Sequence, residues 1–386
     1  MRQQRSSFRT AETEQLPSPH TSYGNKIGEI DKAMKTKLKK GVGLLCACLA
    51  LASLSLTAWA APTSLASQAP SHGEEVIVGG CLFGVRMYTE GVMVVGLDKI
   101  SAKAGQSSHS PAHEAGIRMK DILLEIDGKP VTDNESVTRS ITESGGRTLT
   151  VRLRRDGKDL TLSLTPALNA EGKYAAGFWL RDAAAGVGTV TYVKPQTGEF
   201  GGLGHGICDG DTGALLPLKR GAVSEVELLG IVKGQRGTPG EVKGAFSGGK
   251  CGALIRNTPC GAYGVFTTVP ASLGERMKTA SRDEIKEGGA LLRCAVDGTV
   301  RDYSVNISAI NHGRENGKNF TVTIMDSSLL AITGGIVQGM SGSPIIQNGK
   351  LVGAVTHVTI NDPTQGYGIF IENMLKAENL SIALAS

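Results

Sequence analysis

Short runs of alternating apolar residues between glycine-rich turns restrict the fold of this chain more than any other feature. From residue 186 onward such runs recur as "VGTVTYV", "VELLGIV", "NFTVTIM" and "KLVGAVTHVTI". Alternation with a period of two places one face of a strand in a core, whereas an amphipathic helix needs a period near 3.6. The 52 glycines and the aromatic content of 4% agree with many turns and close backbone approaches. A β-barrel or β-sandwich is therefore predicted for residues 186–386.

A smaller unit precedes this region. The run "TLTVRLRRDGKDLTLSLTP" alternates on both sides of Asp156–Gly157, which predicts a hairpin. Upstream, "SPAHEAGIRMKDILLEIDGKPV" predicts a short helix that ends at Gly116, then a strand and a turn at Asp127–Gly128. This order resembles a PDZ domain over residues 76–166.

The PDZ resemblance implies binding of an extended peptide by strand addition. It places the peptide's terminal carboxylate at the backbone amides of Cys81, Leu82 and Phe83, in the stretch "GGCLFGV". Cys81 and Phe83 depart from the small residues usual in such a loop. A docking or autoinhibitory module with an unused groove is the alternative.

The charge distribution argues against a nucleic-acid partner. The formal net charge is +5, and residues 1–40 hold nine basic and four acidic side chains, which account for all of it. Residues 41–60 have no charged side chain, so the remaining body has a formal net charge of zero. A neutral body gives little attraction for a polyanion.

The beginning of the chain reads as an export signal. Lysines precede the uncharged run "GVGLLCACLALASLSLTAWA" at residues 41–60, which ends in small residues at the positions that a signal peptidase reads. The run is long enough to span a bilayer, so a cleaved signal peptide and a retained anchor are both open. The basic flank places the body outside the cytoplasm in either case. Translation starts at Met1 or at Met34. Residues 61–75 are predicted to form a linker.

The cysteines do not indicate a disulfide framework or a metal site. Two of the seven lie inside the apolar run, which leaves an odd number without CxxC spacing in the body. His113–Glu114 lacks the second histidine of HExxH, so no zinc-protease motif is present there. We expect neither a metal nor another cofactor.

One serine is surrounded by small residues in the stretch "GGIVQGMSGSPIIQNGKLVGAVTHV". A serine hydroxyl is a weak nucleophile that needs an adjacent base and two backbone amides for the developing oxyanion. Ser341 is the predicted nucleophile, and the amides of Gly339 and Ser341 are the predicted oxyanion hole. The Asn348–Gly349 pair predicts a tight hairpin behind the serine. A glycine-rich turn with an incidental serine is the alternative.

The order of residues favours a chymotrypsin-like arrangement over an α/β-hydrolase. The elbow of an α/β-hydrolase requires G-x-S-x-G, and here the fifth residue is Ser343. Upstream of the serine, His205 lies between two glycines and is the predicted general base. His312 and His357 are weaker candidates, and His357 is expected in the pocket wall. Asp209 and Asp211 follow His205 closely in the sequence.

Asp326 is the predicted third member. It follows a strand-like run, fifteen residues before Ser341, where a carboxylate could accept a proton from the imidazole and fix its tautomer.

The stretches "GEFGGLGHGICDGDTG" and "IMDSSLLAITGGIVQGMSGSPIIQNGKLVGAVTHVTINDPTQGYGIFIENML", with the PDZ-like unit before them, resemble the stage IV sporulation protein B peptidases of endospore-forming bacteria. The resemblance implies a chymotrypsin-like serine peptidase that is exported from the forespore to the space between the two sporangial membranes. It implies His205, Asp326 and Ser341 as the functional residues. It also implies self-cleavage and cleavage of a membrane-bound regulator of a sigma-factor-processing metalloprotease. Met340 stands where trypsin-like enzymes place the aspartate that pairs with a new N-terminus.

The resulting expectation is a mainly β serine endopeptidase with a PDZ domain followed by a chymotrypsin-like double β-barrel. Its partners would be protein substrates and a PDZ peptide ligand, with membrane association through residues 41–60 before release. Two other functions stay open: a PDZ adaptor with an inactive peptidase-like domain, and a general extracytoplasmic quality-control protease. The predicted segments are a leader (1–60), a linker (61–75), the PDZ domain (76–166), a second linker (167–185) and the peptidase domain (186–386).

Overall fold

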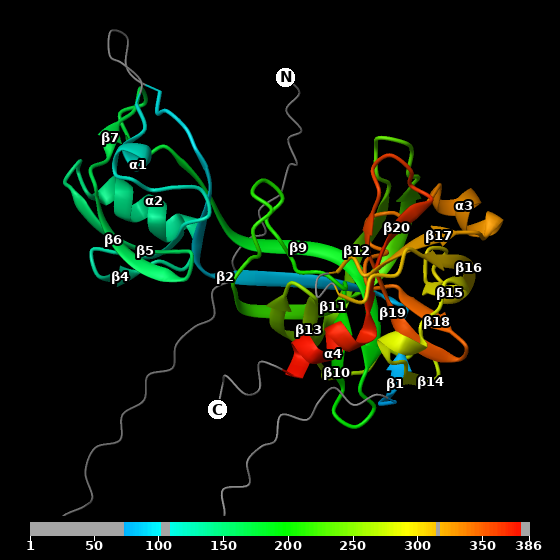
Figure 1. Ribbon diagram of the computed structural model, residues 1–386. Coiled ribbons are helices and arrows are strands. Elements are labelled where there is room, and N and C mark those ends of the chain that lie inside the picture. Colours follow the sequence, from blue (N-terminus) through cyan, green and yellow to red (C-terminus); the bar gives the residue numbers. More distant parts are fainter. Residues whose placement is uncertain (1–72, 102–108, 314–316, 380–386) are drawn as a thin grey trace, which may run out of the picture. The chain divides into compact units, whose positions relative to one another are not determined.

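The computed structural model describes residues 73–101, 109–313 and 317–379. The predicted leader at residues 1–60 lies outside the described residues, as does most of the predicted linker at residues 61–75. In the part of the chain that is described, no helix is long and apolar enough to cross a membrane. Strands joined by turns and short helices make up most of the fold (Figure 1). The prediction of a mainly β fold is confirmed.

A first barrel is closed by hydrogen-bonded neighbours that return to the starting strand. Its strands, in spatial order, are β2 (Leu82–Leu97), β9 (Phe178–Val193), β10 (Glu199–Gly202), β13 (Gly261–Phe266), β12 (Glu241–Thr258) and β11 (Leu218–Val232), which pairs again with β2. Aromatic rings fill its core. Phe200 is fully buried, with its ring centroid 5.7 Å from that of Phe83 and 4.5 Å from that of Phe266.

A second barrel follows in the sequence and closes in the same way. Its strands, in spatial order, are β15 (Gly288–Cys294), β16 (Arg301–Ser308), β17 (Phe320–Ile324), β20 (Gln365–Phe370), β19 (Lys350–Val358) and β18 (Pro344–Gln347), which pairs again with β15. The β18–β19 hairpin turns at Asn348 and Gly349, which both have positive φ, as the sequence predicts. Two closed barrels confirm the predicted double-barrel peptidase fold.

Short elements join the two barrels. Strand β1 (Glu75–Val78) pairs with β9 and with β14 (Arg276–Thr279), and β14 pairs in parallel with β19. A 3-10 helix, η1 (Arg282–Glu284), follows β14, and α3 (Ser327–Thr333) follows β17. The helix α4 (Ile371–Asn379) buries Met374 and Leu375 in the same cluster as two valines of β1.

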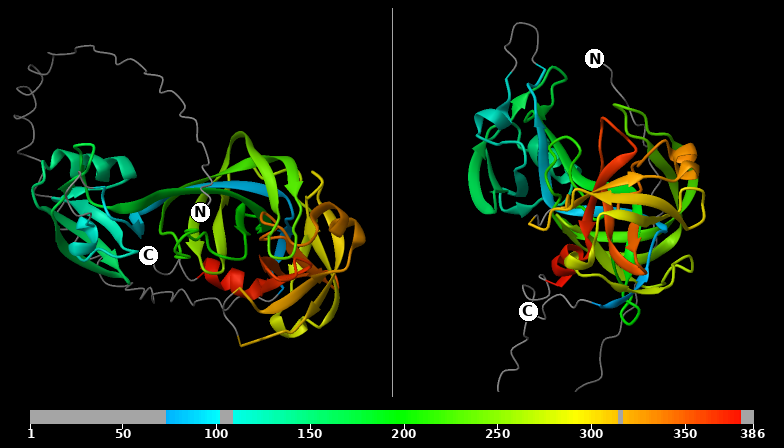
Figure 2. Two further views of the ribbon diagram at one scale, coloured as in Figure 1. Left: turned by 90° about the horizontal axis from the view of Figure 1, so that it is seen from above. Right: turned by 45° about the vertical axis from the view of Figure 1, so that its right-hand side comes forward.

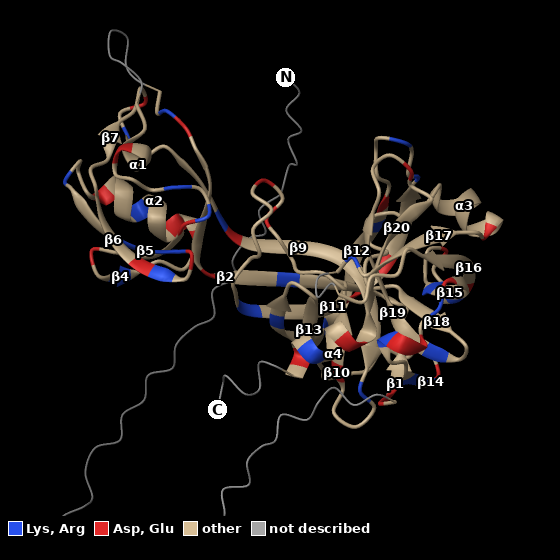
Figure 3. Ribbon diagram, in the orientation of Figure 1, with Lys and Arg blue, Asp and Glu red and all other residues tan. Residues whose placement is uncertain are grey.

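The PDZ part is built from elements between β2 and β9. They are α1 (Pro111–Glu114), β3 (Ile122–Ile126), β4 (Lys129–Pro130), α2 (Asn134–Glu143), β5 (Leu149–Arg155), β6 (Lys158–Leu164), β7 (Ala167–Leu168) and β8 (Tyr174–Ala175). The predicted hairpin is formed by β5 and β6 around Asp156–Gly157. Basic and acidic residues are interspersed along these elements, in keeping with the neutral body expected from the sequence (Figure 3).

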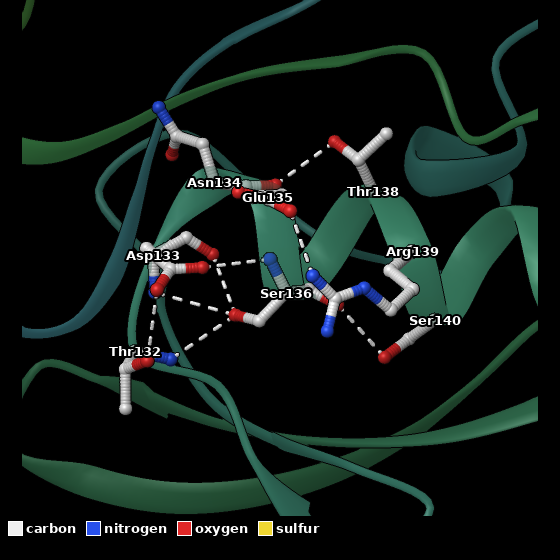
Figure 4. Close-up of polar contacts among 8 residues, drawn as sticks. All are labelled: Thr132, Asp133, Asn134, Glu135, Ser136, Thr138, Arg139 and Ser140. Atoms are coloured by element: carbon white, nitrogen blue, oxygen red, sulfur yellow. Dashed lines mark hydrogen bonds and ion pairs between the residues drawn. The ribbon is translucent and has the colours of Figure 1, made fainter. Parts of the chain in front are cut away.

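Local hydrogen bonds explain where α2 begins. The carboxylate of Asp133 accepts from the backbone amide of Ser136 at 2.7 Å, and the Ser136 hydroxyl accepts from the Asp133 amide at 3.3 Å (Figure 4). This capping box satisfies backbone donors that the first turn leaves free. One turn further, Arg139 pairs with Glu135 at 2.7 Å. Val137 and Ile141 point into the PDZ core.

The structure draws the domain boundaries differently from the sequence prediction. The first half of β2 pairs with β9 and β11 in the first barrel, whereas its second half pairs with β3 and with Phe178–Arg181 of β9. The PDZ elements are thus inserted between β2 and β9, which continue from one part into the other as long paired strands (Figure 2). Residues 167–185 are not a linker, because they form β7, β8 and the first half of β9.

The predicted carboxylate loop of the PDZ domain is also wrong. Phe83 pairs with Gly188 on one side and with Glu225 on the other, so both backbone edges are occupied. Cys81 and Phe83 are 5% and 2% exposed in the core of the first barrel. The apolar character of these residues, which is unusual for a carboxylate loop, reflects that burial.

We expect Phe200→Ala to lower the free energy of unfolding by about 3–5 kcal/mol, because it removes a fully buried ring between two others. Phe246→Ala is the matched control, since Phe246 is 36% exposed, and it should cost about 1 kcal/mol or less. Urea denaturation followed by circular dichroism measures both. Equal losses would contradict the placement of Phe200 in the barrel core.

Candidate active site

The turn that carries Ser341 has one glycine two residues before the serine and another directly after it, and both adopt backbone angles that favour glycine. Gly339 has φ 98° and Gly342 has φ 94°, in the region that side chains disfavour. A Cβ on Gly342 would lie 2.1 Å from the carbonyl oxygen of Thr189 and 2.4 Å from the amide of Leu203. The backbone of the serine turn therefore approaches the first barrel more closely than any side chain would allow.

Strand β9 holds this turn by donating hydrogen bonds to the carbonyl groups of the turn. The amide of Thr189 donates to the Ser341 carbonyl at 2.9 Å, and its hydroxyl donates to the Gly339 carbonyl at 2.8 Å. The hydroxyl of Thr191 donates to the Gly342 carbonyl at 2.7 Å. Among the described residues, the amides of Gly339 and Ser341 donate no hydrogen bond. These two N–H groups are therefore free to meet a developing oxyanion.

The two serines of the motif have different surroundings. Ser341 is half-buried and lines a cleft of about 830 Å³, where its hydroxyl donates to the carbonyl of Thr356 at 2.8 Å. Ser343 is fully buried and does not line that cleft, and its hydroxyl lies 3.5 Å from that of Thr189. Only Ser341 is accessible to a substrate.

His205 lies on the loop between β10 and β11 and lines the same cleft. Leu203 and Gly204 both have positive φ, which turns the chain sharply before the imidazole. The Nδ1 atom lies 2.8 Å from the carbonyl oxygen of Gly206. Because a carbonyl only accepts, Nδ1 carries the hydrogen and Nε2 is left as the basic nitrogen. Burial lowers the pKa of His205, and the bond to Gly206 offsets this in part, so the imidazole is neutral at pH 7.

A second histidine stands beside the first. The rings of His205 and His357 have centroids 5.0 Å apart, and both line the cleft together with Lys318. Burial, followed by the charges of His205 and Lys318, lowers the pKa of His357 to about 4. The expected place of His357 in the pocket wall is confirmed. Both imidazoles are neutral over the physiological range.

The structure does not bring Asp326 to His205. Its carboxylate accepts from the amides of Ser328 at 2.9 Å and Leu329 at 3.1 Å, as the N-cap of α3. Hydrogen bonds, first from the Ser328 side chain, lower the pKa of Asp326. It does not line the cleft, and the Gly206 carbonyl takes the position at Nδ1 that we predicted for it. The sequence did contain a signal, because Asp followed by Ser-Ser-Leu-Leu fits a helix N-terminus.

The loop that carries His205 is held by a residue that sequence reasoning missed. Asn257 of β12 accepts from the Ile207 amide at 2.7 Å and donates to the carbonyls of Ile207 and Leu216 at 2.8 Å and 2.9 Å. It thereby ties the two ends of the loop together. No local pattern marks Asn257, because its partners are about forty to fifty residues away in the sequence.

The walls of the cleft include several small and apolar side chains. Within the described residues, no group of three or more His, Cys, Asp or Glu side chains is placed to hold a metal ion. Small and apolar members of the wall include Val85, Ala184, Val187, Ile207, Leu215 and Pro259.

Two family models match the chain. The model for the SpoIVB peptidase S55 covers residues 172–375, a little over half of the chain, and a PDZ domain model covers residues 83–165. The second match extends into the part of β2 that the structure assigns to the first barrel.

Curated relatives share only short segments with this chain. The chain spans less than a quarter of the length of these relatives. The serine protease HTRA1 of Xenopus laevis is 40% identical over 57 residues, which is 15% of this chain and 12% of that protein. The regulator of sigma-E protease RseP of Salmonella typhimurium is 30% identical over 71 residues, or 18% of this chain and 16% of that protein.

Solved structures are similar over parts of the chain. The PDZ domain of an SdrC-like protein from Listeria monocytogenes is 22% identical, with a TM-score of 0.19, and covers 24% of this chain and 87% of that one. The active form of the Rv3671c protease from M. tuberculosis is 15% identical, with a TM-score of 0.31, and covers 51% of this chain and 74% of that one.

The double barrel, the accessible serine and histidine in one cleft and the long match to the family model agree with one another. The chain therefore belongs to the SpoIVB peptidase S55 family and carries a PDZ domain.

Proposed function

We propose that Ser341 is the nucleophile and His205 the general base of this peptidase. The observation that supports this most is their position in one cleft, beside two backbone amides that donate no hydrogen bond to any residue that the structure describes. In the resting arrangement the Ser341 hydroxyl donates to the Thr356 carbonyl. This mechanism requires the Ser341 hydroxyl to rotate toward Nε2 of His205, which is the ring nitrogen that Gly206 leaves unbound. Catalytic hydrogen bonds often form fully only with substrate present.

Each group then has a defined part in the reaction. Nε2 of His205 takes the hydroxyl proton while Ser341 Oγ attacks the peptide carbonyl carbon. The amides of Gly339 and Ser341 donate to the oxyanion of the tetrahedral intermediate. His205 returns the proton to the leaving amine, and a water molecule hydrolyses the acyl-enzyme by the same route. The Gly206 carbonyl keeps the imidazole in the required tautomer throughout.

The biological role that we propose is sporulation signalling. The enzyme would be exported from the forespore to the intermembrane space, and its apolar run at residues 41–60 would associate it with the membrane before release. It would cleave itself and a membrane-bound regulator that controls a sigma-factor-processing metalloprotease. Support comes from the family description and from the apolar run with its basic flank. The PDZ domain would bind an extended peptide from one of these partners.

We expect Ser341→Ala and His205→Ala each to remove nearly all turnover, because each eliminates a group that forms or breaks bonds. Ser343→Ala should keep most of it, since that hydroxyl is buried outside the cleft. Peptide hydrolysis and labelling by a fluorophosphonate probe measure the three variants. Equal loss from both serine changes in folded protein would refute the assignment, and an unlabelled wild type would favour an inactive PDZ adaptor.

Asp326→Asn should keep turnover, because asparagine caps a helix as well as aspartate does and the carboxylate does not reach His205. Asp326→Ala removes the cap and should lower the free energy of unfolding by about 1 kcal/mol. Steady-state kinetics and thermal melting separate the two effects. A folded Asp326→Asn variant without turnover would restore Asp326 as a catalytic residue.

Self-cleavage should occur between the apolar run and Glu75. Strand β1 begins at Glu75 and pairs with β9 and β14, and Val76 and Val78 are fully buried, so the chain is protected from there on. Intact-mass measurement of the wild type and the Ser341→Ala variant, purified in parallel, identifies the N-terminus of each. The same N-terminus in both proteins would mean that another enzyme makes the cut.

A further inference from the structure

The loop that carries His205 has a second anchor, at its tip. Oδ1 of Asp209 accepts from the amides of Thr212 at 2.8 Å and Asp211 at 3.2 Å, and from the Thr212 hydroxyl at 2.8 Å. These bonds close the tip into a tight turn. The other carboxylate oxygen forms an ion pair with Nε of Arg181, on β9, in which the two atoms do not meet hydrogen-bond geometry.

The two partners of this pair differ in burial. The side chain of Asp209 is 0% exposed, and that of Arg181 is 37% exposed. Burial raises the pKa of Asp209, but hydrogen bonds from Thr212 and the charge of Arg181 outweigh it, so the pKa is lowered. Removing the cation from a fully buried carboxylate is strongly destabilising, because it leaves a buried charge without a partner. The same guanidinium reaches Asp211 at 2.8 Å, but that carboxylate is 64% exposed and adds little.

Arg181 is itself held in place. The next residue on β9, Asp182, accepts from the Asn134 amide at the start of α2 at 2.8 Å. Its carbonyl accepts from the Thr89 hydroxyl at 3.1 Å. Arg181 therefore projects from a fixed strand onto a loop whose residues Asp209, Gly210 and Gly213 line the cleft.

We propose that Arg181 is a positioning residue that acts through Asp209 to hold the loop of His205 against the cleft. This inference rests on the proposed role of His205 as the base. Without the ion pair, the tip of the loop loses its attachment to β9, whereas the attachment at Asn257 stays. Water then reaches the imidazole more easily, and Nε2 spends less time in line with Ser341.

Arg181→Gln in the full chain should lower kcat/KM on the order of tenfold to a hundredfold. The acidic limb of its pH profile should move up toward pH 6.5, because a more hydrated His205 loses part of the burial that lowers its pKa. Arg181→Lys keeps the positive charge but lacks the planar guanidinium. Because the charge is kept, kcat/KM should fall less in Arg181→Lys than in Arg181→Gln. A purely structural role would lower stability without moving the acidic limb.

Arg155→Gln is the matched control. Arg155 also pairs with a buried carboxylate, that of Asp121, with two contacts of 2.7 Å, but in the PDZ part and outside the cleft. Arg155→Gln should lower the free energy of unfolding and leave the acidic limb of the pH profile unchanged. Should Arg181→Gln fail to fold, Arg181→Gln with Asp209→Asn leaves no buried charge alone and should still show the shifted limb.

An NMR titration of His205 tests the inference without a measurement of turnover. It is carried out in the Ser341→Ala background, with the resonance assigned by its loss in His205→Gln. The pKa of His205 should rise in Arg181→Gln and stay at the wild-type value in Arg155→Gln. An unchanged pKa in both refutes the positioning role. A wild type without Ser341-dependent turnover refutes the proposed function instead, and the titration still decides the role of Arg181.

Discussion

The rest of the site depends on the hydrogen bonds between β9 and the serine turn. Thr189 and Thr191 of the first barrel donate to three carbonyl groups of a turn that belongs to the second. The bonds occupy the carbonyls and leave the amides of Gly339 and Ser341 free, which is the polarity that an oxyanion hole requires. Thr189 donates from both its amide and its hydroxyl, and Thr191 donates from its hydroxyl, while the Gly342 amide donates to the Val355 carbonyl of β19 at 2.7 Å.

Strand β9 connects this site with the PDZ elements. Its second half carries the threonines that hold the serine turn, and its first half carries Arg181, which holds the loop of His205. Both halves pair with the one long strand β2. The two-stranded ribbon of β2 and β9 therefore supports both the serine turn and the loop of His205, which Asn257 of β12 also holds. The far end of the ribbon belongs to the sheet of the PDZ part.

The orienting group of the imidazole is a backbone carbonyl in this structure. A carboxylate behind His205 would stabilise the imidazolium that forms during the reaction, whereas the Gly206 carbonyl fixes the tautomer without a full charge. The neighbouring His357 adds no negative charge either. The protonated intermediate is therefore expected to receive less electrostatic support than in a triad with an aspartate.

The sequence by itself determined the strand pattern, the hairpin at Asn348, the accessible serine and the histidine between glycines. These features are encoded by neighbours in the chain, through alternation, turn chemistry and positive φ at glycine. The tertiary structure alone decided the insertion of the PDZ elements, the burial of Phe83 in a barrel and the position of Asp326 outside the cleft. It also decided which groups hold the two loops. The physical reason is that closing a barrel and burying a charge bring together residues far apart in sequence, and local patterns do not record which partner will be nearest.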